Sequence, residues 1–154
     1  MGGGSGMEVY FYHLERQSLD DALPKLLELS LARAWRAVVQ AASEERVEAL
    51  NTRLWTYRQD SFLPHGTAGE GRPAEHPIYL TTGDDNPNGA QIRFLVDGAV
   101  LADTSSYVRV AYVFDGGDTE AVARAREAWQ AAKTRGDAVS YWQQEPDGSW
   151  HQKA

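Results

Sequence analysis

The chain has 154 residues, no cysteine and a formal net charge of −7 at pH 7. This length fits one domain with a sizeable core, and the lack of cysteine excludes disulfides and thiolate metal sites. The acidic balance argues against broad binding along duplex DNA, because that mode needs many lysines and arginines to neutralise phosphates.

Neither a membrane span of ~20 apolar residues nor a signal peptide is recognisable in the sequence. We therefore expect a soluble, cytoplasmic protein. Residues 1–6, Met-Gly-Gly-Gly-Ser-Gly, precede a second methionine at Met7 and are interpreted as an artificial flexible extension. The single domain is expected to occupy residues 7–154.

The first part of the chain predicts alternating strands and helices. Glu8–Leu14 is rich in aromatic and β-branched residues, which favours a buried strand. Apolar residues at helical spacing predict a helix over Leu23–Arg36, with Pro24 in its first turn. Ala37–Ala41 has the length of a strand, and Ser43 is expected to cap a second helix.

The remaining part begins with the glycine- and proline-rich segment Ser61–Pro77, which predicts a long loop. Asp118 or Thr119 is expected to cap a helix that ends at Arg135, before Gly136. The predicted strands are Pro77–Thr82, Gln91–Val96, Tyr107–Phe114, Ala138–Gln144 and Ser149–His151, the last two joined by a turn at Pro146–Gly148.

Successive strand, helix and strand units pack as right-handed parallel crossovers. The sequence therefore predicts a single-domain, doubly wound, mostly parallel α/β sheet with helices on both faces and a C-terminal hairpin.

Such a sheet raises the alternative of a nucleotide-dependent enzyme, because these folds bind ligands at the carboxyl ends of their strands. However, no glycine-rich turn follows the first strand, and the pattern GxxxxGK[ST] does not occur. The four histidines are scattered, without the HExxH spacing of a metal site. We predict no catalytic residue, metal or cofactor.

The predicted helix before Gly136 carries a basic and aromatic stripe. Arg126, Trp129 and Lys133 fall on neighbouring turns of one helix face, and Arg124 lies off this stripe. In one interpretation Trp129 simply joins the core while the cations solvate its edges. In the other, the indole and the cations form a shallow pocket for a short acidic peptide. Direct binding of single-stranded DNA by exposed tryptophans is a further alternative.

Leu54-Trp55, followed by Ser61-Phe-Leu-Pro-His-Gly-Thr-Ala-Gly-Glu-Gly71, resembles the chi subunit family of bacterial DNA polymerase III. The resemblance continues through Asn86–Gly89 and the Ala-Arg-Ala-Arg-Glu-Ala-Trp129 run to Gln144. It implies a non-catalytic accessory subunit that links the clamp loader to single-stranded DNA-binding protein by binding that protein's acidic C-terminal tail. It also implies pairing with a psi subunit where one exists, and only indirect contact with nucleic acid. The tail-binding residues that the resemblance implies are Trp55, Phe62, Arg124, Arg126, Trp129 and Lys133.

Overall fold

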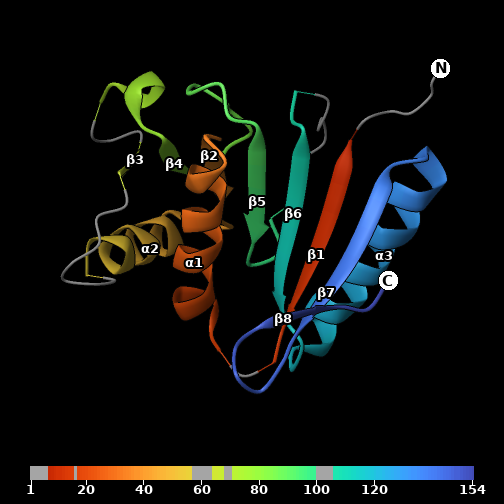
Figure 1. The fold of residues 1–154 in the computed structure, drawn as a ribbon. Coiled ribbons are helices and arrows are strands. Elements are labelled where there is room, and N and C mark those ends of the chain that lie inside the picture. Colours follow the sequence, from red (N-terminus) through yellow and green to blue (C-terminus); the bar gives the residue numbers. More distant parts are fainter. Residues whose placement is uncertain (1–6, 16, 57–63, 68–70, 100–105) are drawn as a thin grey trace.

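The protein folds into a mostly parallel sheet flanked by helices, in a computed structural model that describes residues 7–15, 17–56, 64–67, 71–99 and 106–154 (Figure 1). Residues 1–6, which the sequence assigns to an extension, lie outside this description. In chain order the helices and strands are β1 (Glu8–Leu14), α1 (Leu19–Ala32), β2 (Ala37–Gln40), α2 (Glu44–Thr56), β3 (His65–Thr67), β4 (Ile78–Thr81), β5 (Ile92–Val96), β6 (Arg109–Asp115), α3 (Thr119–Arg135), β7 (Ala138–Gln144) and β8 (Trp150–Gln152).

The strand order is β3-β4-β2-β5-β6-β1-β7-β8. Every described pair is parallel except β7 with β8, which form an antiparallel hairpin at the end of the chain. The predicted α/β class, the mostly parallel sheet and the C-terminal hairpin are confirmed.

The sheet has a core on each face. On one face, Leu23 and Leu27 of α1 and Leu50 of α2 pack against the strands. On the other face, Ala125 and Ala132 of α3 pack against a second set of buried strand residues, which includes Phe11, Val38 and Val110. We call these the α1/α2 face and the α3 face (Figure 1). The prediction of helices on both faces is confirmed.

Helix α1 differs from its prediction at both ends. It begins at Leu19 because the Ser18 side chain accepts a hydrogen bond from the backbone N–H of Asp21. Pro24 therefore lies in the second turn, where its missing N–H leaves the carbonyl of Asp20 without its usual helical donor. Arg53 of α2 supplies that donor, with its Nε 3.1 Å from the Asp20 oxygen. The helix ends at Ala32, and Ala34 follows in a left-handed conformation at φ 63°.

The prediction of a long loop over Ser61–Pro77 is wrong for part of the described segment. His65–Thr67 forms β3, which pairs in parallel with β4, and a short 3₁₀ turn occupies Pro73–Glu75. A three-residue edge strand is too short to produce a period in the sequence. Residues 61–63 and 68–70 of this segment lie outside the described residues.

Candidate functional site

Helix α3 positions the basic and aromatic stripe. Its start is fixed by Asp118, whose side chain accepts hydrogen bonds from the backbone N–H groups of Glu120 and Ala121. Its end is fixed by Gly136, which adopts the left-handed conformation at φ 86° that glycine tolerates best. The caps and the end at Arg135 agree with the sequence prediction. Between them, small alanines let the helix lie close to β1, β6 and β7.

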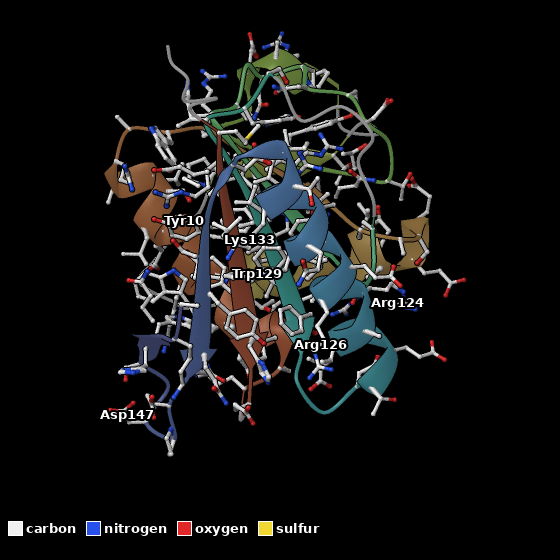
Figure 2. All side chains as sticks on the ribbon, turned by 90° about the vertical axis from the view of Figure 1, so that its right-hand side faces the viewer. Tyr10, Arg124, Arg126, Trp129, Lys133 and Asp147 are labelled. Atoms are coloured by element: carbon white, nitrogen blue, oxygen red, sulfur yellow. The ribbon has the colours of Figure 1, made fainter. Side chains whose placement is uncertain are left out.

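Trp129 lies half-buried on the side of α3 that faces β7 (Figure 2). Its ring packs edge-on against Phe11, at 5.5 Å between ring centroids, and against Tyr141 at 5.9 Å. The Lys133 ammonium lies 5.5 Å from the centre of the Trp129 ring, within the range of a cation–π interaction. One part of the indole is therefore held by the core, while another part remains accessible.

Two exposed cations, Arg126 and Lys133, lie on either side of Trp129 along the helix. Neither forms an ion pair with a described acidic residue, whereas Arg124 pairs with Glu120 at 3.3 Å and Arg135 pairs with Asp137 at 2.9 Å. The stripe therefore presents positive charge that the described part of the protein does not neutralise. We call Arg126, Trp129 and Lys133 the α3 patch.

Tyr141 of β7 borders the α3 patch and was not among the predicted site residues. Burial raises the pKa of the Tyr141 phenol, and the nearby charge of Arg126 acts in the opposite direction. The phenol therefore stays protonated near neutral pH. Its hydroxyl oxygen lies 2.5 Å from His13 Nδ1 on β1.

The remaining predicted site residues are separated from the α3 patch. Arg124 projects from the opposite side of α3 (Figure 2), where it helps to line a hollow of about 390 Å³ with Leu95 and Ala99. Trp55 lies on α2, which packs on the other face of the sheet, and is 52% exposed. Its ring contacts His65 of β3, with 4.8 Å between centroids. Phe62 lies outside the described residues.

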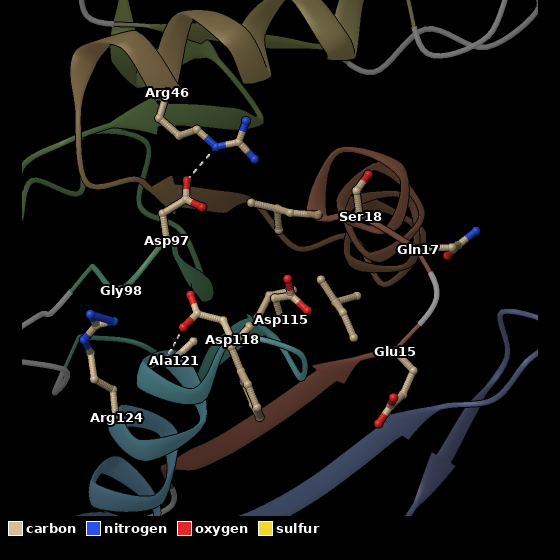
Figure 3. A pocket seen from close by; sticks show the side chains of 14 residues that line it. Glu15, Gln17, Ser18, Arg46, Asp97, Gly98, Asp115, Asp118, Ala121 and Arg124 are labelled. Carbon is tan, nitrogen blue, oxygen red and sulfur yellow. Dashed lines mark hydrogen bonds and ion pairs between the residues drawn. The ribbon is translucent and has the colours of Figure 1, made fainter.

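The carboxyl ends of β1, β5 and β6 border a larger cleft of about 650 Å³ (Figure 3). It lies where doubly wound sheets bind nucleotides. Its two arginines are both paired with carboxylates: Arg46 with Asp20 and Asp97, each at 2.7 Å, and Arg124 with Glu120. The acidic lining residues are Glu15, Asp97, Asp115 and Asp118. This excess of carboxylates is unfavourable for the phosphates of a nucleotide.

The described residues contain no group of three or more histidine, aspartate or glutamate side chains arranged to hold a metal ion. Within the same ranges, no helix has both the length and the apolar character needed to cross a membrane.

Comparison with known proteins gives two matches. The family described as "DNA polymerase III chi subunit, HolC" matches residues 7–140. The protein named "Probable DNA polymerase III subunit chi" from Rickettsia prowazekii (strain Madrid E) is 30% identical over 102 residues, which cover 64% of this chain and 62% of the relative. The match to that relative thus spans less than two thirds of its length. Because the family match extends over most of the chain, including the α3 patch, the protein belongs to the DNA polymerase III chi subunit family.

Proposed function

We propose that this protein is a non-catalytic, cytoplasmic accessory subunit of the replicative DNA polymerase III holoenzyme. In this role it binds the acidic, phenylalanine-ended C-terminal tail of single-stranded DNA-binding protein and links that protein to the clamp loader. Contact with nucleic acid is then indirect. Family membership supports the assignment to the polymerase, and the α3 patch supports the mode of binding.

The observation that carries the proposal is the half-buried Trp129 between two cations that lack described carboxylate partners. A partly accessible indole offers an apolar contact for the terminal phenyl ring of a peptide. Arg126 and Lys133 can pair with carboxylates on either side of that ring. The combination favours a peptide that is both anionic and aromatic over a purely acidic one.

The expected affinity follows from these contacts. A buried aromatic anchor contributes about 2 kcal/mol or more, whereas each exposed ion pair contributes about 0–1 kcal/mol. Such a small site is compatible with a dissociation constant on the order of micromolar. Because the pairs are exposed, affinity should fall as salt concentration rises.

The proposal is tested by fluorescence anisotropy with a labelled acidic peptide that ends in phenylalanine. We expect Arg126→Ala, Lys133→Ala and Trp129→Ala each to weaken binding severalfold. Trp129→Ala also removes contacts with Phe11 and Tyr141, so its melting temperature is measured alongside, and the two charge variants keep the test valid if that variant unfolds. Unchanged affinity in both charge variants would contradict the proposed site.

Two control variants separate this site from other surfaces. Arg135→Ala removes a cation from the same helix that already pairs with Asp137, so we expect little effect on peptide affinity. Trp55→Ala removes the exposed indole on the opposite face and should likewise have little effect. A loss of affinity in Trp55→Ala as large as in Trp129→Ala would move the peptide to the α1/α2 face.

The psi subunit, where one exists, would require a different surface from the α3 patch if both partners bind at once. Trp55 offers such a surface, because it is an exposed aromatic residue on the other face of the sheet. The Leu54-Trp55 pair also lies within the residues that match the family.

A further inference from the structure

Three side chains form a hydrogen-bonded chain beside the α3 patch. Glu15 Oε1 lies 2.9 Å from His13 Nε2, and the other nitrogen of that imidazole, Nδ1, lies 2.5 Å from the Tyr141 hydroxyl. The Gln143 side chain holds the Glu15 carboxylate in place by donating a hydrogen bond of 2.6 Å to its Oε1. The chain therefore runs from the carboxyl edge of the sheet to the tyrosine that contacts Trp129.

The imidazole has little freedom to leave this position. It packs between the rings of Phe114, at 5.2 Å, and Tyr141, at 5.8 Å. On another side it lies against Gly116, where a β-carbon would come within 1.9 Å of His13 Nε2. Only glycine fits at that position without displacing the ring.

The geometry determines which nitrogen of neutral His13 carries the proton. An ionised Glu15 carboxylate can only accept, so Nε2 must be the N–H donor to it. Nδ1 is then bare and accepts the hydroxyl hydrogen of Tyr141. Protonation of the imidazole reverses this last bond, because Nδ1–H now donates to the Tyr141 oxygen. The hydroxyl hydrogen is thereby released for another acceptor.

We propose that Tyr141 is a further contact residue of the peptide site, and that protonation of His13 turns its hydroxyl into a donor for a peptide carboxylate. This inference rests on the proposed function. Tyr141 is partly exposed, contacts Trp129 and lies within the electrostatic reach of Arg126, so an anion held by Arg126 lies near its hydroxyl. Peptide binding then takes up a proton and strengthens as pH falls.

Of the charged groups near His13, the Glu15 carboxylate favours a protonated imidazole, whereas the two nearby cations act against it. Glu15 stabilises the imidazolium directly, and Lys153 of the C-terminal segment lines a small hollow with Glu15 and Gln143. Arg126 on α3 acts electrostatically on Tyr141, the hydrogen-bond partner of His13. Among the described residues, Phe114 at the end of β6 and Gly116 just after it contact the ring, and neither carries a charge. His151 of β8 lies opposite Gln143 in the hairpin, is exposed, and is the matched control histidine.

The experiment measures the affinity of the labelled acidic peptide between pH 8 and pH 5.5, where peptide carboxylates stay ionised. We expect wild-type affinity to rise about tenfold over this range, the lower end of what one added hydrogen bond to a charged acceptor contributes. Tyr141→Phe keeps the ring packing but removes the donor, so its affinity should show no such rise. His13→Gln should also lose the rise, whereas His151→Gln should keep it.

A second measurement examines the free protein. Nitrogen-15 NMR of the imidazole at pH 8 should show His13 with its proton on Nε2; a proton on Nδ1 would overturn the inference. An equal rise in wild type and Tyr141→Phe would overturn it too, while leaving the proposed function intact. Failure of the wild type to bind the peptide at any pH would instead refute the proposed function, and with it this dependent inference. Melting temperatures identify a misfolded Tyr141→Phe, in which case His13→Gln decides.

Discussion

Arg93 of β5 is a buried cation, and its hydrogen bonds are expected to contribute to the stability of the fold. Its side chain is fully buried, yet no described carboxylate lies within ion-pair distance of its guanidinium. Neutral acceptors surround it instead. Gln40 Oε1 accepts from Nε at 3.0 Å and from Nη2 at 2.7 Å, and the Tyr107 hydroxyl accepts from Nη1 at 2.7 Å. The backbone carbonyls of Gly83 and Asp85, between β4 and β5, accept further hydrogen bonds from the guanidinium.

We expect Arg93→Met to lower the free energy of unfolding by about 3 kcal/mol. The substitution keeps apolar volume but removes the hydrogen bonds that Arg93 donates to Gln40 and Tyr107, in a site that water does not reach, and the loss of a buried donor costs about 1–3 kcal/mol for each acceptor. The two carbonyls lie on exposed loop residues, so they can turn toward water at smaller cost. For a chain of this length the loss corresponds to a fall in melting temperature of roughly 6–12 °C.

Urea unfolding followed by tryptophan fluorescence measures the change. The matched variant is the double substitution Arg93→Met with Gln40→Leu, which removes both partners and should recover much of the lost stability. A loss below about 1 kcal/mol in the single variant, or a double variant no more stable than the single one, would refute this explanation of the buried cation.

Two further predictions concern other parts of the fold. Ser18→Ala should cost about 0.5–1 kcal/mol in urea unfolding because it removes the N-cap of α1, whereas Ser18→Asp should retain that stability; equal losses in both would argue against the cap. Burial, partly opposed by Arg109, raises the pKa of Tyr12 to about 12. The folded state thus keeps a proton that the unfolded chain releases above about pH 10, so stability should fall as pH rises from about 10 to about 12, and Tyr12→Phe should reduce that fall in urea titrations at alkaline pH.

The fold was predictable where a local signal fixes it. Helix α3 begins after Asp118, whose side chain accepts hydrogen bonds from the first turn, and ends before Gly136, which adopts a left-handed conformation. Both roles depend only on the local backbone, so the local sequence predicts both ends. The start of α1 also has a local signal, the Ser18 cap, which the apolar spacing alone overlooked, whereas the end of α1 was misplaced for the converse reason. Ala34 ends it in a left-handed conformation that alanine rarely adopts, so nothing in the local sequence marks the boundary.

The partners of the α3 patch depend on strand order, which the sequence pattern does not determine. Tyr141 and His13 are 128 residues apart, and they meet because β1 lies between β6 and β7. A sheet in which β1 and β7 were not neighbours would satisfy the same hydrophobic pattern but would separate them. The Glu15–His13–Tyr141 chain therefore had no sequence signal beyond the residue types themselves.

The direction of the crossovers separates Trp55 from the α3 patch. From β1 the chain passes through α1 to β2 toward one edge of the sheet, and from β6 it passes through α3 to β7 toward the other edge. Right-handed crossovers in opposite directions place their helices on opposite faces. The resemblance names residues on both α2 and α3, and these two helices pack on opposite faces of the sheet. If the protein links two partners, as we propose, a separate surface on each face would allow both partners to bind without competing.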